Sequence, residues 1–450
     1  MRLSVWLPLA VLSALPSVCG AAARPHYGGT LRVEIHAAPA SLDPAAPDAA
    51  PLASLVFEPL VRLDAAGVPQ PCLAVSWQHD ASAKRWQFNL RPGVKFHDGF
   101  PLVASAVVAS LQSVLPGVAI AAGSDAVIIR ADRPMPGLAL DLAHNGLVFA
   151  HNAANGLVGT GPFHLSSWEP GRHAILAAYD DYWGGRPFLD AIEVQMGRPL
   201  RDQFVDLEIG KADITELGPG ELRRTTERGR TVWSSAPINL IALVFARGRA
   251  PNPRVRQALA LSIDRAAMHN VLLQKQGDIS AALLPQWLSG YAFAFPPAPD
   301  LPRAQALTAP LPPQARTLTL AFDPAIVAAR SLAERVAVNA RDAGLTVQVS
   351  PQSSQADLRL VQIRLTTFDS GRALAAVAAA LGFEPPPTAS TPEALYDAER
   401  GLLDGWRVIP LFHLPELYAA ANRVRVFVPP PLTRLGDWRF ENVWLNGTAP

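Results

Sequence analysis

The sequence predicts an α/β protein with at least two lobes. Its 450 residues exceed what one hydrophobic core usually organises, because chains longer than about 250–300 residues divide into separate units. Hydrophobic residues make up 49% of the chain and charged residues 17%, so we expect a large buried interior and exclude wholesale disorder. Strand-like and helix-like patterns alternate without a sustained repeat, which is typical of α/β architecture.

Three short stretches carry the strand pattern, and two longer ones carry the helix pattern. Apolar and polar residues alternate in TLRVEI at 30–35, WQFNL at 86–90 and LTVQV at 345–349, which predicts strands. The stretch 331–344 places its apolar residues on one helical face and ends with a glycine suited to a helix C-terminus. In 252–265, an asparagine that can cap the helix precedes a proline at the first helical position.

The N-terminal segment predicts an exported protein. Arg2 precedes the apolar run LSVWLPLAVLSALPSV, and three alanines at 21–23 suit a signal peptidase, so we expect cleavage after residue 23. The run is shorter than the roughly 20 residues needed to span a bilayer. Lipidation at Cys19 is the alternative, but residues 16–18 lack the small residue found immediately before lipid-modified cysteines.

Charge and cysteine content exclude several classes of protein. The formal net charge of +1 offers no electrostatic footprint for nucleic acid or for an anionic membrane surface. After cleavage the chain keeps one cysteine, Cys72, so an intramolecular disulfide is excluded. The apolar neighbours Leu73 and Val75 indicate that this cysteine is a small buried hydrophobic residue.

The stretch LRPGVKFHDGFPL places His97 beside Asp98, which raises the question of an acid-base pair. Pro92-Gly93 fits the centre of a type II turn, and Asp98-Gly99 fits a turn in which the glycine takes positive φ. No neighbouring nucleophile or orienting group accompanies the histidine, so we interpret it as structural. Proline-rich stretches at 285–313 and 384–394 predict irregular surface loops.

Motifs of catalysis and metal binding are missing from the sequence. It contains no Gly-x-Ser-x-Gly elbow, no phosphate loop, no His-Glu-x-x-His and no paired cysteines. We therefore expect no enzymatic activity, no cofactor and no bound metal.

Six segments occur in the order found in one known family. They resemble the family 5 solute-binding proteins, the periplasmic receptors of peptide and nickel ABC importers. The resemblance rests on residues 57–111, 159–194, 207–214, 252–268, 408–427 and 440–445, which include FEPLVRLD, GTGPFHLSSWEPG, LEIGKADI and NPRVRQALALSIDR.

The resemblance implies a bilobal periplasmic-binding-protein fold, type II, of the large peptide-binding class. Such a fold has two hinge strands and an inserted subdomain in the first lobe. The implied first lobe covers 24–50, 156–238 and 409–450, with the subdomain at 51–155 and the second lobe at 239–408. The implied hinges are the segments Ile238–Phe245 and Trp406–Phe412, and the ligand would lie between the lobes.

The sequence also departs from the family pattern. Val103 and Ala106 stand where a threonine cap and an aspartate are usual, and Ala246 replaces an asparagine at the end of the first hinge strand. The Asp-Pro segment that pairs with the amino terminus of a bound peptide is not recognisable, and its nearest counterpart is Asp369-Ser370. Peptide specificity is therefore left open.

Six residues are the candidate ligand contacts. They are chosen because they match cleft-facing positions of the family or lie near the points where the chain is expected to pass between the lobes. An alternative holds for the histidines, because a lone histidine is more often a hydrogen-bonded structural residue than a ligand contact. Glu216 and Asp369 are expected to face each other across the ligand and to favour a cationic or amine-bearing solute. The candidates are His36, Glu216, Asn239, Asp369, Trp406 and His413.

Together these features predict a monomeric periplasmic receptor. It would capture a small solute, either a peptide or another amine-bearing compound, and deliver it to an ABC permease in the inner membrane. The alternative is an exported binding protein without a transport role, or an enzyme, built on the same scaffold. Turnover assays separate these possibilities, because a receptor binds stoichiometrically and leaves its solute unchanged.

Overall fold

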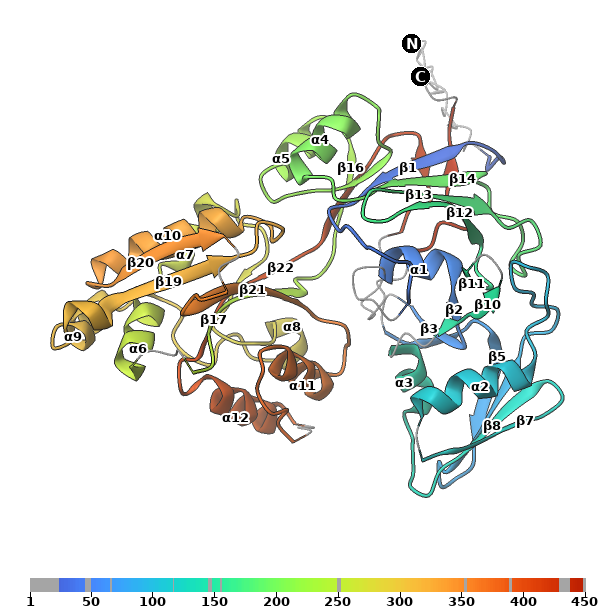
Figure 1. Cartoon of the computed structure of the whole chain (residues 1–450), viewed down its shortest axis with the longest axis horizontal. Helices are drawn as coiled ribbons and strands as arrows, with labels where there is room; N and C mark the ends of the chain where they lie inside the picture. The colour runs from blue at the N-terminus through green and yellow to red at the C-terminus, as the bar shows by residue number, and fades with distance from the viewer. Residues whose placement is uncertain are drawn as a thin grey trace, which may run out of the picture.

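Two large sheets, one in each of two lobes, organise the computed structural model (Figure 1). The structure describes residues 24–44, 50–64, 67–115, 117–144, 148–153, 156–248, 252–351, 354–387, 391–428 and 438–447. The predicted signal segment and Cys19 lie outside the described residues. The two-lobed α/β architecture expected from length and periodicity is confirmed.

A seven-stranded mixed sheet forms lobe I. Its three middle strands run parallel, and the strands on either side pair antiparallel. In order across the sheet the strands are β12 (Phe163–Glu169), β13 (His173–Ala178), β14 (Ala191–Gln195), β1 (Thr30–Glu34), β15 (Ile214–Glu216), β23 (Leu417–Ala420) and β16 (Thr231–Ser234).

Helices cover both faces of this sheet. Helix α1 (Ala50–Val56) packs on the face where Leu31 and Val33 are buried, and the pair β24 (Val424–Arg425) and β25 (Trp444–Leu445) adds to that layer. Helix α4 (Leu200–Glu208) packs on the opposite face, and α5 (Leu222–Glu227) lies beside it. Alternate residues of β23 face the two layers, as the two-residue period of a strand requires.

Asp213 joins strand β1, near the start of lobe I, to the C-terminal segment that follows β23. Its carboxylate accepts hydrogen bonds from the Arg32 side chain at 3.0 Å and from Arg423 at 2.6 and 2.7 Å. The Asp213 side chain is 1% exposed. Burial alone would raise its pKa, but the two guanidinium groups hold the pKa below the usual value.

The subdomain is a smaller unit inserted between α1 and β12. Its largest sheet has four antiparallel strands, in the order β5 (Ala74–His79), β6 (Arg85–Leu90), β8 (Ala126–Arg130) and β7 (Ala119–Ala122). Its other elements are α2 (Ala104–Val114), α3 (Leu138–His144) and the strand pairs β2 (Glu58–Pro59) with β9 (Val148–Phe149), β3 (Val61–Leu63) with β4 (Pro69–Pro71), and β10 (His151–Ala153) with β11 (Gly156–Val158). Helix α2 begins after Val103 without a side-chain cap, as the sequence predicts.

A buried carboxylate joins the subdomain to lobe I. Glu58 is 5% exposed and accepts hydrogen bonds from Thr160 Oγ1 at 2.8 Å, Tyr182 OH at 2.9 Å and Trp183 Nε1 at 2.8 Å. The Cys72 thiol, which is buried as predicted, lies 3.7 Å from the same carboxylate. Because Thr160, Tyr182 and Trp183 follow β11 in the chain, their hydrogen bonds to Glu58 hold the subdomain and lobe I as one unit.

Lobe II is built on a six-stranded sheet. Its strands, in order, are β18 (Asp278–Ile279), β22 (Val408–Leu414), β17 (Asn239–Phe245), β21 (Leu358–Arg364), β19 (Thr317–Phe322) and β20 (Thr346–Pro351). Its helices are α6 (Pro253–Ser262), α7 (Arg265–Val271), α8 (Gln286–Ser289), α9 (Leu301–Thr308), α10 (Ala329–Asp342), α11 (Ser370–Ala380) and α12 (Pro392–Leu403), with a 3₁₀ turn at Pro313–Arg316.

The helix signals read from the sequence are confirmed, but one loop prediction is wrong. The Asn252 side chain caps α6 by accepting from Arg254 N–H at 2.9 Å, and Gly344 follows α10 with φ +76°. The proline-rich stretch 285–313, predicted to be irregular, contains α8 and α9. Helix α9 forms because Asp300 caps it and Pro302 lies in its first turn, where proline is tolerated.

The chain passes between the lobes twice, at 235–238 and at 415–416. The two passages pair with each other, since Ser235 N–H donates to Glu416 O at 2.9 Å and Glu416 N–H donates to Ser235 Oγ at 2.8 Å. These passages differ from the hinges implied by the resemblance. Strands β17 and β22 belong wholly to the lobe II sheet, where bending would break a continuous ladder, and β22 stays in it through Leu414 rather than leaving at Ile409.

Among the described residues, no helix combines the length and the apolar character needed to cross a bilayer.

Replacing Asp213 with Asn should lower the free energy of unfolding by about 3 kcal/mol at neutral pH, because both arginines would lose a buried partner. The folded-state pKa of Asp213 is depressed, so its contribution is present above the unfolded value of 3.8 and is lost as the pH falls through the folded value. The variant should therefore lose less stability in acid than the parent. Urea unfolding at several pH values measures both effects.

Asp181→Asn is the matched control, because Asp181 is 63% exposed and pairs only with Lys95 at the surface. It should change stability by less than about 1 kcal/mol. Equal effects of the two substitutions at neutral pH would contradict the structural role given to Asp213.

Candidate functional site

A cavity lies between the lobes at the carboxyl ends of the parallel strands of lobe I. Strands β1 and β15 run side by side in the same direction, so their ends meet at one edge of the sheet. His36 follows β1, and Glu216 is the last residue of β15. Ligands of open α/β sheets bind at this edge, because the loops there leave a crevice.

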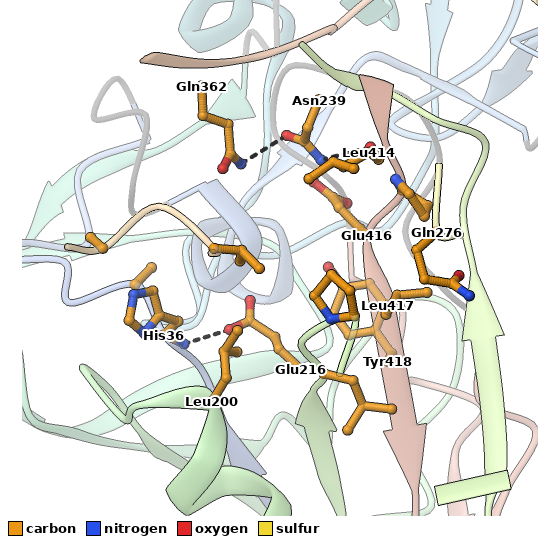
Figure 2. A pocket seen from close by; sticks show the side chains of 16 residues that line it. His36, Leu200, Glu216, Asn239, Gln276, Gln362, Leu414, Glu416, Leu417 and Tyr418 are labelled. Atoms are coloured by element: carbon orange, nitrogen blue, oxygen red, sulfur yellow. Dashed lines mark hydrogen bonds between the residues drawn. The ribbon is translucent and has the colours of Figure 1, made fainter. Parts of the chain in front are cut away.

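Glu216 and His36 form the wall contributed by lobe I. One carboxylate oxygen of Glu216 accepts from His36 N–H at 2.5 Å, and Gln203 Oε1 accepts from Glu216 N–H at 2.9 Å. Figure 2 shows the other carboxylate oxygen turned toward the cavity. Burial raises the pKa of Glu216, and the donors His36 N–H and Gln203 partly oppose the rise.

The His36 ring has one nitrogen committed and one available. Its Nδ1 lies 3.1 Å from the carbonyl oxygen of Arg198, which can only accept, so Nδ1 carries the hydrogen. The remaining nitrogen, Nε2, accepts a hydrogen bond when the ring is neutral and donates one when it is protonated.

Amide side chains form the wall contributed by lobe II. Asn239, the first residue of β17, accepts through Oδ1 from Gln362 Nε2 at 3.1 Å, and its Nδ2 lies 3.5 Å from Leu414 O (Figure 2). Gln276 is a third amide in this wall. These groups can donate and accept hydrogen bonds but carry no charge.

The return passage closes the cavity between the two walls. Glu416 lines it and pairs with Arg364 of β21, whose Nε lies 2.6 Å from Glu416 Oε1. Tyr418, at 7% exposed, forms part of the apolar floor. The Arg364–Glu416 pair is neutral overall, so it adds little net charge to the cavity.

The cavity has a volume of about 250 Å³ and an excess of negative charge. Among the described residues that line it there is no lysine or arginine, so no cation of the lining neutralises Glu216. Within the described part of the chain, no three histidine, cysteine or acidic side chains converge as metal ligands would. The lining therefore offers a carboxylate without a lysine or arginine beside it, together with amide groups.

The structure brings three of the six predicted contact residues together and places three elsewhere. His36, Glu216 and Asn239 line the cavity. The other three, Asp369, Trp406 and His413, each have a local role instead, and none of them lines this cavity.

Helix capping and core packing explain where these three residues lie. The Asp369 carboxylate caps α11 by accepting from Arg372 N–H at 2.8 Å. Trp406 packs on the lobe II core, with its ring 5.0 Å from that of Phe295. His413 is 2% exposed and donates through Nε2 to Leu283 O at 3.0 Å. Asp369 and Glu216 therefore do not face each other across this cavity.

Gln362, Glu416 and Gln276 also line the cavity and were not among the residues predicted from the sequence. Gln362 stands on the same strand face as Leu358 and Leu360, and Glu416 comes shortly after the apolar run VIPLF, so these polar residues are signals that could have indicated them. The structural interpretation of His97 fits its contacts, since its Nε2 lies 2.9 Å from Gly161 O and its backbone N–H donates to Gly159 O.

A protein-family model matches most of the chain. The model of the bacterial extracellular solute-binding proteins, family 5, matches residues 68–128 and 135–400.

Curated proteins similar to this chain include periplasmic binding proteins. A probable D,D-dipeptide-binding periplasmic protein of Escherichia coli is 26% identical over 249 residues, which are 49% of this chain and 48% of the relative. A nickel-binding periplasmic protein of the same organism is 25% identical over 253 residues, 48% of this chain and 47% of the relative. The matched segments thus span about half the length of these relatives.

A solved structure shares the fold of this chain. It is the crystal structure of a dipeptide-binding protein from Pseudoalteromonas in complex with Met-Leu. The TM-score is 0.80 at 17% identity, over 93% of this chain and 100% of that one.

Replacing His413 with Gln should flatten the acid dependence of stability without altering the cavity. Burial lowers the pKa of His413 from 6.5 to about 4. As the pH falls through this interval the unfolded chain takes up a proton that the folded chain does not, so stability present above pH 6.5 is lost. Glutamine can still donate to Leu283 O and does not titrate.

Urea unfolding at several pH values between 7 and 4 tests this expectation. This interval includes the unfolded and the folded pKa of His413. The exposed His79 gives the control His79→Gln, which should follow the parent curve. A variant His413→Gln whose stability falls as steeply as that of the parent would contradict the assignment.

Proposed function

We propose that this chain, which belongs to the family 5 bacterial extracellular solute-binding proteins, is a receptor that captures a small solute between its two lobes. The family model covers well over half of the residues, which shows the family membership. The observation that carries the proposal is the cavity itself. Its walls come from both lobes, so a solute bound there joins Glu216 of lobe I to Asn239 of lobe II.

The proposed solute carries an amine or another cationic group. Glu216 is buried, carries a raised pKa and has no lysine or arginine partner in the lining. A cationic group would supply the missing charge and would bring the pKa back down. The amides of Asn239 and Gln362 would then bind a neutral polar part of the same solute.

The space available supports a solute of dipeptide size. A second hollow of about 450 Å³ shares Gln362 with the cavity and is lined by residues 359–362 of β21 and by residues 321–323 at the end of β19. Relatives named for dipeptide binding and for nickel binding both match this chain. A peptide or similar amine-bearing compound fits the lining better than a bare metal ion, because among the described residues no three histidine, cysteine or acidic side chains converge to bind nickel.

The proposed cellular role follows from the family. The receptor acts as a monomer in the periplasm after removal of residues 1–23, and delivers its solute to an ABC permease in the inner membrane. The proposed receptor is not an enzyme, because the cavity presents binding groups and no nucleophile aligned with a base.

Native mass spectrometry of protein purified from its own periplasm tests the proposal. The expected result is one co-purified small molecule per chain, which rebinds in calorimetry at a stoichiometry of one and is recovered unchanged. A panel of dipeptides, tripeptides and the nickel–histidine complex serves as probe if the solute is lost in purification. Failure of every probe to bind, or chemical conversion of the bound molecule, would overturn the receptor proposal.

Replacing Glu216 with Gln should weaken binding of an amine-bearing solute by about 2 kcal/mol, or about thirtyfold. Glutamine can still accept from His36 N–H, so the loop is retained while the charge is lost. The raised pKa of Glu216 also predicts that the parent binds less tightly as the pH falls from neutral toward that pKa, and that the variant lacks this dependence.

Calorimetry at several pH values measures both quantities, with Glu227→Gln as the control for removal of an exposed carboxylate elsewhere in lobe I. If Glu216→Gln and Glu227→Gln bind as tightly as the parent, the amine-bearing solute is excluded, although the receptor proposal survives.

A further inference from the structure

The lobes touch at a second place, away from the two passages of the chain. On the subdomain side are Gly67, in the turn between β3 and β4, and Asp141 on α3. On the lobe II side are Phe368 and Arg372, at the start of α11. We name these four residues the latch, and we propose that the latch holds the lobes together in the absence of solute.

An ion pair forms the polar half of the latch. Arg372 donates through Nη1 to Asp141 Oδ1, and the partners are 46% and 32% exposed. The hydrogen bond to Asp141 raises the pKa of Arg372, as expected for a cation beside a carboxylate. Because the pair is partly exposed, it should favour the closed over the open arrangement by a severalfold ratio, and the lobes can still open.

An aromatic ring seated on a glycine forms the apolar half. Gly67 has φ +78°, and a Cβ added to it would lie 2.5 Å from Cδ2 of Phe368. The ring therefore rests directly on the backbone of the hairpin turn. Only glycine provides both the positive φ and the space for this close approach.

Asp369 acquires a role through the latch. It was predicted to contact the ligand, and instead its carboxylate caps α11 by binding the backbone N–H of Arg372. The cap fixes the first turn of the helix from which the Arg372 side chain reaches Asp141. Phe368 and Asp369 are adjacent, so both halves of the latch depend on this helix start.

The latch also connects to the first passage between the lobes. Phe368 packs edge-on against Trp287, with ring centroids 6.0 Å apart, and Trp287 Nε1 donates to Pro237 O at 3.1 Å. Pro237 lies in the passage at 235–238. On the other side, Glu58 holds the subdomain and lobe I as one unit, so opening the lobes must separate Gly67 from Phe368 and Asp141 from Arg372.

The latch has a consequence for binding that rests on the proposed receptor function. A contact that favours the closed arrangement in the absence of solute lowers the free-energy cost of lobe closure on binding. Loss of the latch should therefore weaken affinity by about threefold to fivefold. The latch itself is measurable without any solute.

Small-angle X-ray scattering of the solute-free protein tests the latch. Arg372→Gln and Gly67→Ala should each increase the radius of gyration, and raising the salt concentration should expand the parent but not Arg372→Gln, because salt screens the ion pair. Arg341→Gln removes an exposed lobe II arginine outside the latch, and Gly93→Ala imposes a similar backbone strain where an added Cβ meets nothing within 4 Å. Both controls should scatter like the parent.

The proposal is overturned if either Arg372→Gln or Gly67→Ala leaves the radius of gyration at the parent value while remaining folded. Thermal unfolding of each variant establishes that it is folded. Because no solute is present, this failure would refute the latch alone and would leave the receptor proposal intact.

Discussion

The pairing of the two passages between the lobes is the constraint on which the rest of the structure depends. Each large sheet is complete within its own lobe, and within the part of the chain that the structure describes the lobes are linked at 235–238 and 415–416. Ser235 and Glu416 join these two segments by two hydrogen bonds. The cavity lies beside this junction and takes its walls from both lobes, so its shape is set by how the lobes lie about the paired passages. In the proposed receptor, binding and lobe position would therefore be coupled by geometry, as in other proteins that close around a ligand.

Buried carboxylates show how the same chemical group serves stability in some places and binding in another. Asp213 is held by two arginines, Glu58 by three neutral donors, and Glu399 in lobe II by Tyr291 OH and Leu283 N–H. Each of these acids joins segments distant in sequence, and leaving one unpaired would be costly. Glu216 differs because it lines the cavity between the lobes, with one carboxylate oxygen turned toward it (Figure 2). That difference supports the proposal that Glu216 binds the solute.

The sequence predicted what depends on local pattern and missed what depends on packing. The alternation in TLRVEI, the cap at Asn252 and the glycine at 344 gave elements that the structure confirms, because these signals act within one turn or strand. The resemblance identified the family and led to His36, Glu216 and Asn239. Asp369, Trp406 and His413 do not line this cavity, and position along the chain does not reveal which way a side chain points. Gln362 and Glu416 reach the cavity through pairing of β21 with β17 and through the return passage, which the sequence of either segment alone does not specify.

Hydrogen–deuterium exchange with the co-purified solute added or removed tests the central claim most directly. If the solute lies between the lobes beside the paired passages, protection should appear in both lobes, at the amides around 216–219 and 414–418 and around 239 and 362. The outer strands β12 and β20 should exchange at unchanged rates. Protection confined to one lobe, or to a surface away from these segments, would contradict the account.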